Sequence, residues 1–234
     1  MKRIRLIASA SCLLAYATAV PAQGVKQEVQ QKLATVKESV ARNQAALRQY
    51  SWTEHTDMSL KGEVKKSTDT LCRYGPDGKV AKTPIGTPAP KREMRGLKKK
   101  VAEKKIGELQ DYMERAAALI HRYMPPSPDS MQAAFQAGNT SLGQAGPGKI
   151  QLQFRDYAKP GDALTFNFDT ASKALQSISV NSYLDDPKDD VVTLAVVFQS
   201  LPDGTNYVAS TTLTAAAKQV VVKTSNTNYQ KLAQ

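Results

Sequence analysis

The sequence predicts an α+β fold: a strongly curved antiparallel sheet or incomplete β-barrel, with a long N-terminal helix and an inserted helix pair acting as a lid. Two observations carry this prediction. Apolar residues recur at the helical period near the N-terminus and in the middle of the chain, but alternate at the two-residue period of strands elsewhere. Turn sequences follow the strand-like segments closely, as in sheets built from hairpins.

Length and composition indicate one soluble globular domain. The chain has 234 residues, of which 41% are hydrophobic, with 32 Lys plus Arg, 21 Asp plus Glu and only two cysteines. These values exclude a miniprotein built on disulfides and a membrane protein with several spans.

The first residues have the pattern of a secretory signal peptide. A positive segment containing Lys2, Arg3 and Arg5 precedes the apolar run 6–20, and Val20-Pro21-Ala22 offers a cleavage site with small residues. The run is shorter than the roughly 20 residues that span a bilayer. We therefore expect residues 1–22 to be cleaved and residues 23–234 to form a single domain in the periplasm.

Cleavage would leave Cys72 as the only cysteine, so an internal disulfide is excluded and stability must come from a hydrophobic core. We expect Cys72 to be a small buried hydrophobe, with a thiol for an intermolecular bond as the alternative.

The first mature element is predicted to be an amphipathic helix over residues 25–49. Its apolar stripe consists of Val25, Val29, Leu33, Val36, Val40 and Leu47, with Asn43 at a core position. The same spacing fits a coiled-coil dimer, but packing on a sheet of the same chain, as a monomer, is the favoured interpretation.

The period then changes to that of strands. Residues 50–60 alternate aromatic, β-branched and polar types, and further strands are expected at 64–74 and 79–83, the last two joined by Gly75-Pro76-Asp77-Gly78. Residues 84–96 are rich in Pro, Gly and charge and predict a loop.

Helical periodicity returns at residues 97–123, and a second, short helix is expected at 128–137 with Ser127 as its N-cap and Pro128 at its first position. After a glycine-rich loop at 138–148, almost every segment has the strand pattern. We expect strands near 150–154, 164–168, 175–184, 191–201, 207–215 and 219–224.

No residue pattern indicates catalysis. His55 lies beside Glu54 and Asp57, and His121 lies near a helix end, but neither belongs to a metal-binding or nucleophile motif. The acidic turn, defined as Asp185, Asp186, Asp189 and Asp190, would suit a hard cation, yet a solvated hairpin turn is the favoured interpretation. We expect no enzymatic activity, no metal and no cofactor.

Positive charge is concentrated in one segment. Residues 59–105 contain 14 Lys plus Arg against five Asp plus Glu, and several of these cations oppose the positive end of the predicted helix dipole. Export argues against nucleic acid as a partner, so the segment is either a solvated loop or a contact for lipid headgroups or an acidic protein. The candidate contact residues are Lys91, Arg92, Arg95, Lys98, Lys99 and Lys100.

The order of elements resembles the periplasmic lipoprotein-carrier (LolA-like) superfamily. The resemblance rests on the signal peptide, the helix that leads into Tyr50-Ser51-Trp52-Thr53, the Gly75-Pro76-Asp77-Gly78 hairpin, and helices inserted among antiparallel strands. It covers most of the mature chain as topology and carries no specific motif. It implies an unclosed barrel with helices as a lid and an apolar cavity that binds acyl chains.

The alternation of the strands places one set of apolar residues on the inner face of such a sheet. These residues are Trp52, Met58, Leu152, Phe154, Leu164, Phe166, Phe168, Val180, Val196 and Phe198.

If the helices leave space above this face, these residues line a pocket for a lipid or lipoprotein acyl group. The protein would then contact the membrane surface without spanning the bilayer. If the helices fill the space, the same residues form the hydrophobic core. The leading hypothesis is a noncatalytic carrier. The alternative is an envelope interaction or sensor domain with a filled core and a protein partner, and a hydrolase with an unfamiliar site is the third.

Overall fold

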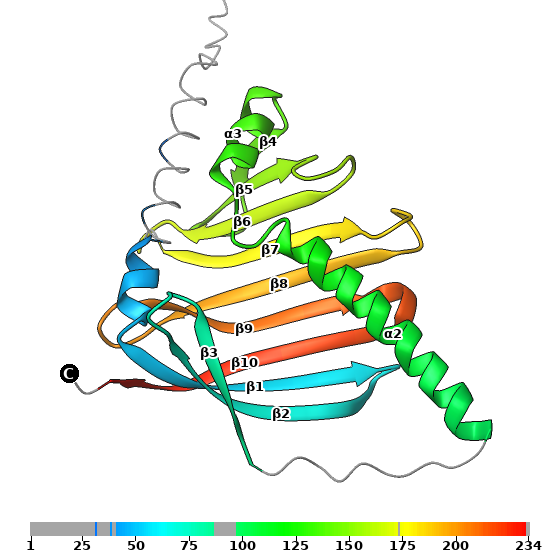
Figure 1. The fold of residues 1–234 in the computed structure, drawn as a ribbon. Coiled ribbons are helices and arrows are strands. Elements are labelled where there is room, and N and C mark those ends of the chain that lie inside the picture. Colours follow the sequence, from blue (N-terminus) through cyan, green and yellow to red (C-terminus); the bar gives the residue numbers. More distant parts are fainter. Residues whose placement is uncertain (1–30, 32–37, 39–40, 87–96, 173, 233–234) are drawn as a thin grey trace, which may run out of the picture.

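The structure, a computed structural model, describes residues 31, 38, 41–86, 97–172 and 174–232. Ten strands form a single antiparallel sheet (Figure 1). The strands are β1 (Tyr50–Leu60), β2 (Glu63–Tyr74), β3 (Val80–Ile85), β4 (Thr140–Gln144), β5 (Lys149–Arg155), β6 (Ala163–Asp169), β7 (Leu175–Tyr183), β8 (Val191–Ser200), β9 (Asn206–Ala215) and β10 (Val220–Lys231).

The sheet is open, with β3 at one edge and β4 at the other. Its order is β3-β2-β1-β10-β9-β8-β7-β6-β5-β4, so every neighbouring pair is consecutive in the chain except β1 and β10. The N-terminal strand therefore pairs with the C-terminal strand in the interior of the sheet. This arrangement confirms the predicted α+β class and the unclosed antiparallel sheet.

Two helices connect the two edges of the sheet. Helix α2 (Leu97–His121) crosses one face of the sheet diagonally, and α3 (Pro128–Gln136) follows it beside β5 (Figure 1). The Oγ of Ser127 accepts a hydrogen bond from the backbone N–H of Ser130, and Pro128 lies at the first helical position, so α3 begins as predicted. We call the face that α2 crosses the inner face.

The inner face of the β5–β8 half is filled. Buried aliphatic and aromatic side chains of these strands pack against Ala116, Leu119 and Tyr123 of α2 and the link that follows it, and against Met131 and Ala134 of α3. Strand alternation points one set of residues from each strand toward these helices. A smaller cluster forms where the middle of α2 crosses the sheet: Tyr112 packs with Ala215 and Val220, close to Met58 and Val222.

Polar side chains fasten the end of α2 to turns at the end of the sheet. The buried Asp162 accepts hydrogen bonds from the Tyr123 hydroxyl (2.5 Å) and from the backbone N–H groups of Tyr157 (2.6 Å), Ala158 (3.0 Å) and Lys159 (2.8 Å). Burial and the bond to Asp162 raise the pKa of Tyr123, so its hydroxyl stays a donor.

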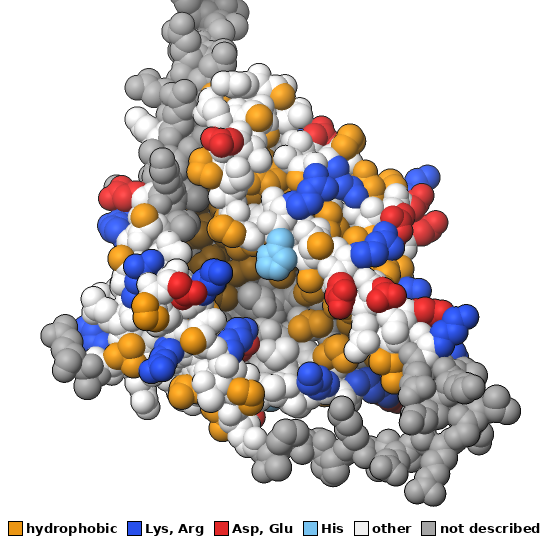
Figure 2. Space-filling view, viewed as in Figure 1, with side chains coloured by type: hydrophobic (Ala, Val, Ile, Leu, Met, Phe, Trp, Pro, Cys, Tyr) orange, Lys and Arg blue, Asp and Glu red, His pale blue; other side chains and the backbone are white. Residues whose placement is uncertain are grey.

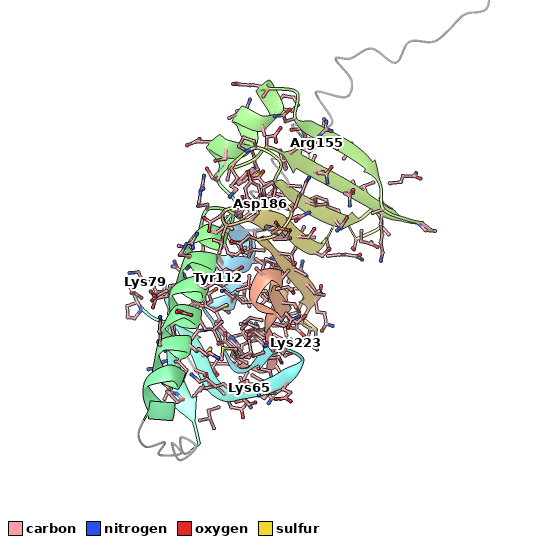
Figure 3. The ribbon with its side chains drawn as sticks, turned by 90° about the vertical axis from the view of Figure 1, so that its right-hand side faces the viewer. Lys65, Lys79, Tyr112, Arg155, Asp186 and Lys223 are labelled. Carbon is pink, nitrogen blue, oxygen red and sulfur yellow. The ribbon has the colours of Figure 1, made fainter. Side chains whose placement is uncertain are left out.

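The acidic turn between β7 and β8 also contacts α2. The Tyr112 hydroxyl donates to Asp190 (2.5 Å), and the Arg115 guanidinium donates to Asp185 (2.6 Å). Figure 3 shows Tyr112 on the helix and Asp186 in the turn on the same side of the sheet. The turn was predicted as solvated, and this holds for the exposed Asp185, Asp186 and Asp189. Two carboxylates, those of Asp185 and the partly buried Asp190, also bind the helix.

The predicted loop at residues 138–148 was wrong, because β4 runs from Thr140 to Gln144. This strand pairs with β5 alone and is mostly exposed, so it needs no alternation of apolar residues. Similarly, β3 extends through Pro84, where the sequence predicted a loop. An edge strand tolerates proline because one side of its backbone forms no hydrogen bonds to another strand. Of the predicted first helix, residues 41–47 are helical, as are residues 31 and 38, and the remainder lies outside the described residues.

Candidate functional site

An apolar cleft opens on the inner face beyond the end of α2. Its volume is about 260 Å³, and Figure 2 shows a hollow floored by hydrophobic side chains on this face. We call it the inner cleft. Its lining consists of Asn43, Gln44, Leu47, Tyr74, Met124, Pro125, Pro126, Leu175, Ile178, Phe198, Asn206, Tyr207 and Val208.

Six separate parts of the chain bring these residues together, among them the end of β2 at Tyr74 and the start of β9 at 206–208. Leu47 comes from the helical segment 41–47, Met124 lies in the link between α2 and α3, and Leu175 and Phe198 come from β7 and β8. The cleft therefore exists because α2 ends before it reaches this corner of the sheet. The sheet supplies the floor, and the helical segment 41–47 and the link between α2 and α3 supply walls.

A β-bulge sets which residues of β9 face the cleft. Opposite β8, Val196 pairs with Thr211 and Phe198 pairs with Val208, so β9 contains one more residue than β8 over this interval. An extra residue reverses the alternation of side chains beyond it. Val208 and Asn206 therefore share the inner face with Phe198, and a regular ladder would have turned them outward.

A polar space adjoins the inner cleft and shares Asn43 and Asn206 with it. We call it the polar annex; its volume is about 290 Å³. The shared residues are joined, because the backbone N–H of Asn206 donates to Oδ1 of Asn43 (3.2 Å), and the Asn206 amide donates to the Leu175 carbonyl (3.0 Å). The annex lining is Arg42, Asn43, Ala46, Ser172, Ala174, Ser200, Asp203, Gly204, Thr205 and Asn206.

Asp203 is the fixed anion of the annex. Its carboxylate accepts hydrogen bonds from the Tyr50 hydroxyl (2.5 Å) and the Thr205 backbone N–H (3.0 Å), and Lys231 lies 3.9 Å away. These donors, led by Tyr50, lower the pKa of Asp203 to about 2. The carboxylate is thus ionised at every pH at which the protein would work.

An aromatic cluster flanks the inner cleft. Trp52 stacks on Tyr229 (ring centroids 5.5 Å apart) and lies against Tyr74 (5.6 Å), while Tyr207 touches Tyr229 (4.4 Å). Tyr74 and Tyr207 also line the cleft, so a single side chain, that of Tyr74, separates the ring of Trp52 from it. Trp52 is the only tryptophan of the chain, which makes its fluorescence a reporter of the cleft.

Most of the predicted apolar candidates lie in the packed core and not in the cleft. Seven of them are at most 4% exposed and belong to the cluster beneath α2 and α3: Leu152, Phe154, Leu164, Phe166, Phe168, Val180 and Val196. Trp52 is buried in the aromatic cluster, and Met58 is partly buried beneath α2. Phe198 is the candidate that lines the inner cleft.

The side chains of the predicted basic contacts lie outside the described part of the structure. Lys91, Arg92 and Arg95 lie outside the described residues. Lys98, Lys99 and Lys100 are in the first turn of α2, which has no acidic residue, and their side chains also lie outside the description. The next basic residues, Lys104 and Lys105, are exposed beside Ile106, which is 52% exposed.

His55 forms a polar cluster with β2 residues on the outer face of the sheet. Its Nδ1 is 2.7 Å from an Asp69 carboxylate oxygen, its Nε2 is 3.2 Å from Asp57, and the Ser67 hydroxyl is 3.4 Å from Nε2. Hydrogen bonds to Asp69 and then Asp57 raise the pKa of His55.

The cluster has the residue types of a nucleophilic triad but the wrong proton arrangement. Ser67 donates its proton to Asp57 (2.6 Å), so its hydroxyl is directed at a carboxylate and not at a His55 base. Among the described residues, no group of His, Cys, Asp and Glu has the arrangement of a metal site.

Sequence reasoning missed the annex and most of the cleft. Asn43 gave the one available signal, because a polar residue on an otherwise apolar helical stripe indicates a contact other than simple core. Asp203 was part of a turn sequence, Pro202-Asp203-Gly204, and its place beside Asn43 depends on tertiary structure.

Comparisons with known proteins identify no family. No family model matches the sequence, and no curated protein matches it. A structure comparison finds a DUF1329 family protein from Desulfovibrio piger, with 13% sequence identity, a TM-score of 0.41, and coverage of 87% of this chain and 92% of that chain. Within the described residues, no helix is both long enough and apolar enough to cross a bilayer.

Proposed function

We propose that the protein is a noncatalytic binding protein or carrier of the periplasm that accepts a single acyl chain of a lipid or lipoprotein in the inner cleft. The observation that carries the proposal is the cleft itself. Its walls are dominated by Leu47, Met124, Pro125, Leu175 and Phe198, so transfer of a hydrocarbon chain from water into it is favourable.

The size of the cleft limits the ligand. At about 260 Å³ it is just below the range of about 300–1,000 Å³ that is usual for small-molecule pockets. One short apolar chain fits this volume, whereas a diacyl lipid requires more space. The proposal is therefore confined to the end of one chain.

The helices supply the roof that a carrier needs. In this proposal α2 and α3 act as a lid that fills the β5–β8 half of the sheet, while the link at Met124 leaves the cleft open. The resemblance of the element order to the lipoprotein-carrier (LolA-like) superfamily supports the same function, as does the expected signal peptide at residues 1–22.

The test compares two neighbouring residues of β8. Phe198 lines the cleft, whereas Val197 is 42% exposed and points to the opposite face. Binding of decanoylglycerol, below its micellar concentration, is measured by calorimetric titration and by the fluorescence of Trp52.

We expect the wild-type protein and the control Val197→Glu to bind equally. Phe198→Glu should weaken binding by about tenfold or more, because its carboxylate must be desolvated beside the chain. The absence of binding to the wild-type protein, or an equal loss in both variants, would overturn the proposal. Thermal unfolding of both variants establishes that they are folded.

A further inference from the structure

The position of the polar annex defines the class of amphiphile that the cleft accepts. We infer that the protein binds a single-chain amphiphile whose polar group is uncharged or zwitterionic and rich in hydrogen-bond donors, with this group in the annex and the acyl chain in the inner cleft. The inference rests on the proposed function, since it describes the other end of the same ligand.

The first argument is the geometry of the two spaces. They share Asn43 and Asn206, and the hydrogen bond between these residues marks the boundary between an apolar side and a polar side. An amphiphile has the same division, from hydrocarbon to polar group over one or two bonds. A chain seated against Leu175 and Phe198 therefore places its polar group at the asparagine pair.

The second argument is the chemistry of the annex. Its neutral polar groups include Ser172, Ser200 and Thr205, and its charges have opposite signs, with the guanidinium of Arg42 and the carboxylate of Asp203. Hydroxyl and amide side chains both donate and accept hydrogen bonds, so they suit a neutral polar group.

Asp203 makes the annex unsuited to an anion. Its pKa of about 2 means that it cannot take up a proton to accommodate a carboxylate, and two like charges in close proximity are unfavourable. The nearby cations offer little compensation. The Arg42 side chain is 71% exposed and already lies 3.8 Å from Glu38, and the Lys231 side chain, 3.9 Å from Asp203, is 61% exposed.

This inference differs from the expectation that the basic segment receives an anionic headgroup. The candidates Lys91, Arg92 and Arg95 lie outside the described residues. Within the described residues, the annex is lined by the helical segment 41–47, the turn between β6 and β7, the end of β8, and the turn that leads into β9.

The experiment compares two ligands with the same chain, decanoylglycerol and decanoate, in three proteins. The wild-type protein should bind decanoylglycerol about fivefold more tightly than decanoate, an effect limited by the partial exposure of Asp203. Asp203→Asn removes the charge and keeps one oxygen acceptor, for the Thr205 N–H, while its NH2 group can donate to the Tyr50 hydroxyl oxygen. The ratio should therefore fall to less than about twofold.

The matched control is Asp111→Asn, which removes the same charge from an exposed position on α2 and should leave the ratio unchanged. Equal or tighter binding of decanoate by the wild-type protein would overturn the inference about the polar group while leaving the acyl site intact. An Asp203→Asn ratio equal to that of the wild-type protein would also overturn it. Binding of neither ligand would instead contradict the proposed function itself.

Discussion

The two halves of the sheet use their inner faces differently. In the β5–β8 half, Leu152, Phe154, Leu164 and Phe166 form a filled core beneath α2 and α3. In the β9, β10, β1 and β2 half, polar residues such as Thr56 continue the same inner face, and apolar residues gather where α2 crosses and in the aromatic cluster beside the inner cleft. The apolar pattern thus follows the helical cover, and the inner cleft lies at the border where that cover ends.

This comparison predicts very different costs for two phenylalanines on the inner face. Phe166→Ala should destabilise the protein by about 4 kcal/mol because it leaves a cavity in the filled half, whereas Phe198→Ala should cost only about 1 kcal/mol because its site is already open to solvent. Urea denaturation followed by Trp52 fluorescence measures both values. Similar costs for the two substitutions would contradict the distinction between a filled half and an open border.

A second prediction concerns the carboxylate that fastens the end of α2 to the filled half. Asp162→Ala should cost about 3 kcal/mol, because it leaves three backbone N–H groups and the Tyr123 hydroxyl without their buried acceptor.

The control for Asp162 is Asp186→Ala in the acidic turn. Asp186 likewise accepts from backbone N–H groups, those of Lys188 and Asp189, but it is exposed, so water replaces it at a cost of about 1 kcal/mol or less. Denaturant midpoints of the two variants provide the measurement. A smaller loss for Asp162→Ala than for Asp186→Ala would show that the end of α2 is not held by this carboxylate.

The smallest expected effect lies on the outer face, at His55. Its pKa is raised in the folded protein by Asp69 and Asp57, so its stabilising contribution is fully present below the unfolded pKa of about 6.5 and is lost as pH rises through the folded pKa. The difference in melting temperature between wild type and His55→Gln should therefore be larger at about pH 5.5 than at about pH 9.

The partner of His55 supplies the control for this pH dependence. When Asp69→Asn is present in both proteins, the effect of His55→Gln on the melting temperature should vary less with pH, because the main cause of the raised pKa is gone. A pH dependence that is unchanged by Asp69→Asn, or one of opposite sign, would show that the pair does not couple to folding.

The sequence predicted the regular elements well where burial produced a clear period. The first strand, 50–60, and the start of α2 at Leu97 agree with the structure, and α3 differs by one residue at its end. Strand β4 was missed because an exposed edge strand needs no alternation of apolar and polar residues. The pairing of β1 with β10 was also beyond prediction, since it joins residues whose separation in the chain has no local signature.

The candidate site was predicted poorly for a related reason. Alternation identifies which residues face inward, but a filled core and an open pocket require the same alternation. Leu152 and Phe198 therefore had the same signal, and only the end of α2 distinguishes them. Asp203 is a residue of the opposite kind. Its sequence context indicated only a turn, and the structure places its carboxylate in the polar annex.

The meeting of the first and last strands has a consequence for how the protein would be made. The Thr56 and Thr224 hydroxyls, 3.1 Å apart, are separated by 168 positions along the chain, so β1, β2 and β3 join the rest of the sheet only after nearly all of the chain has been synthesised. Contacts of such long range form slowly. A polypeptide of this design would stay unfolded for longer during its synthesis.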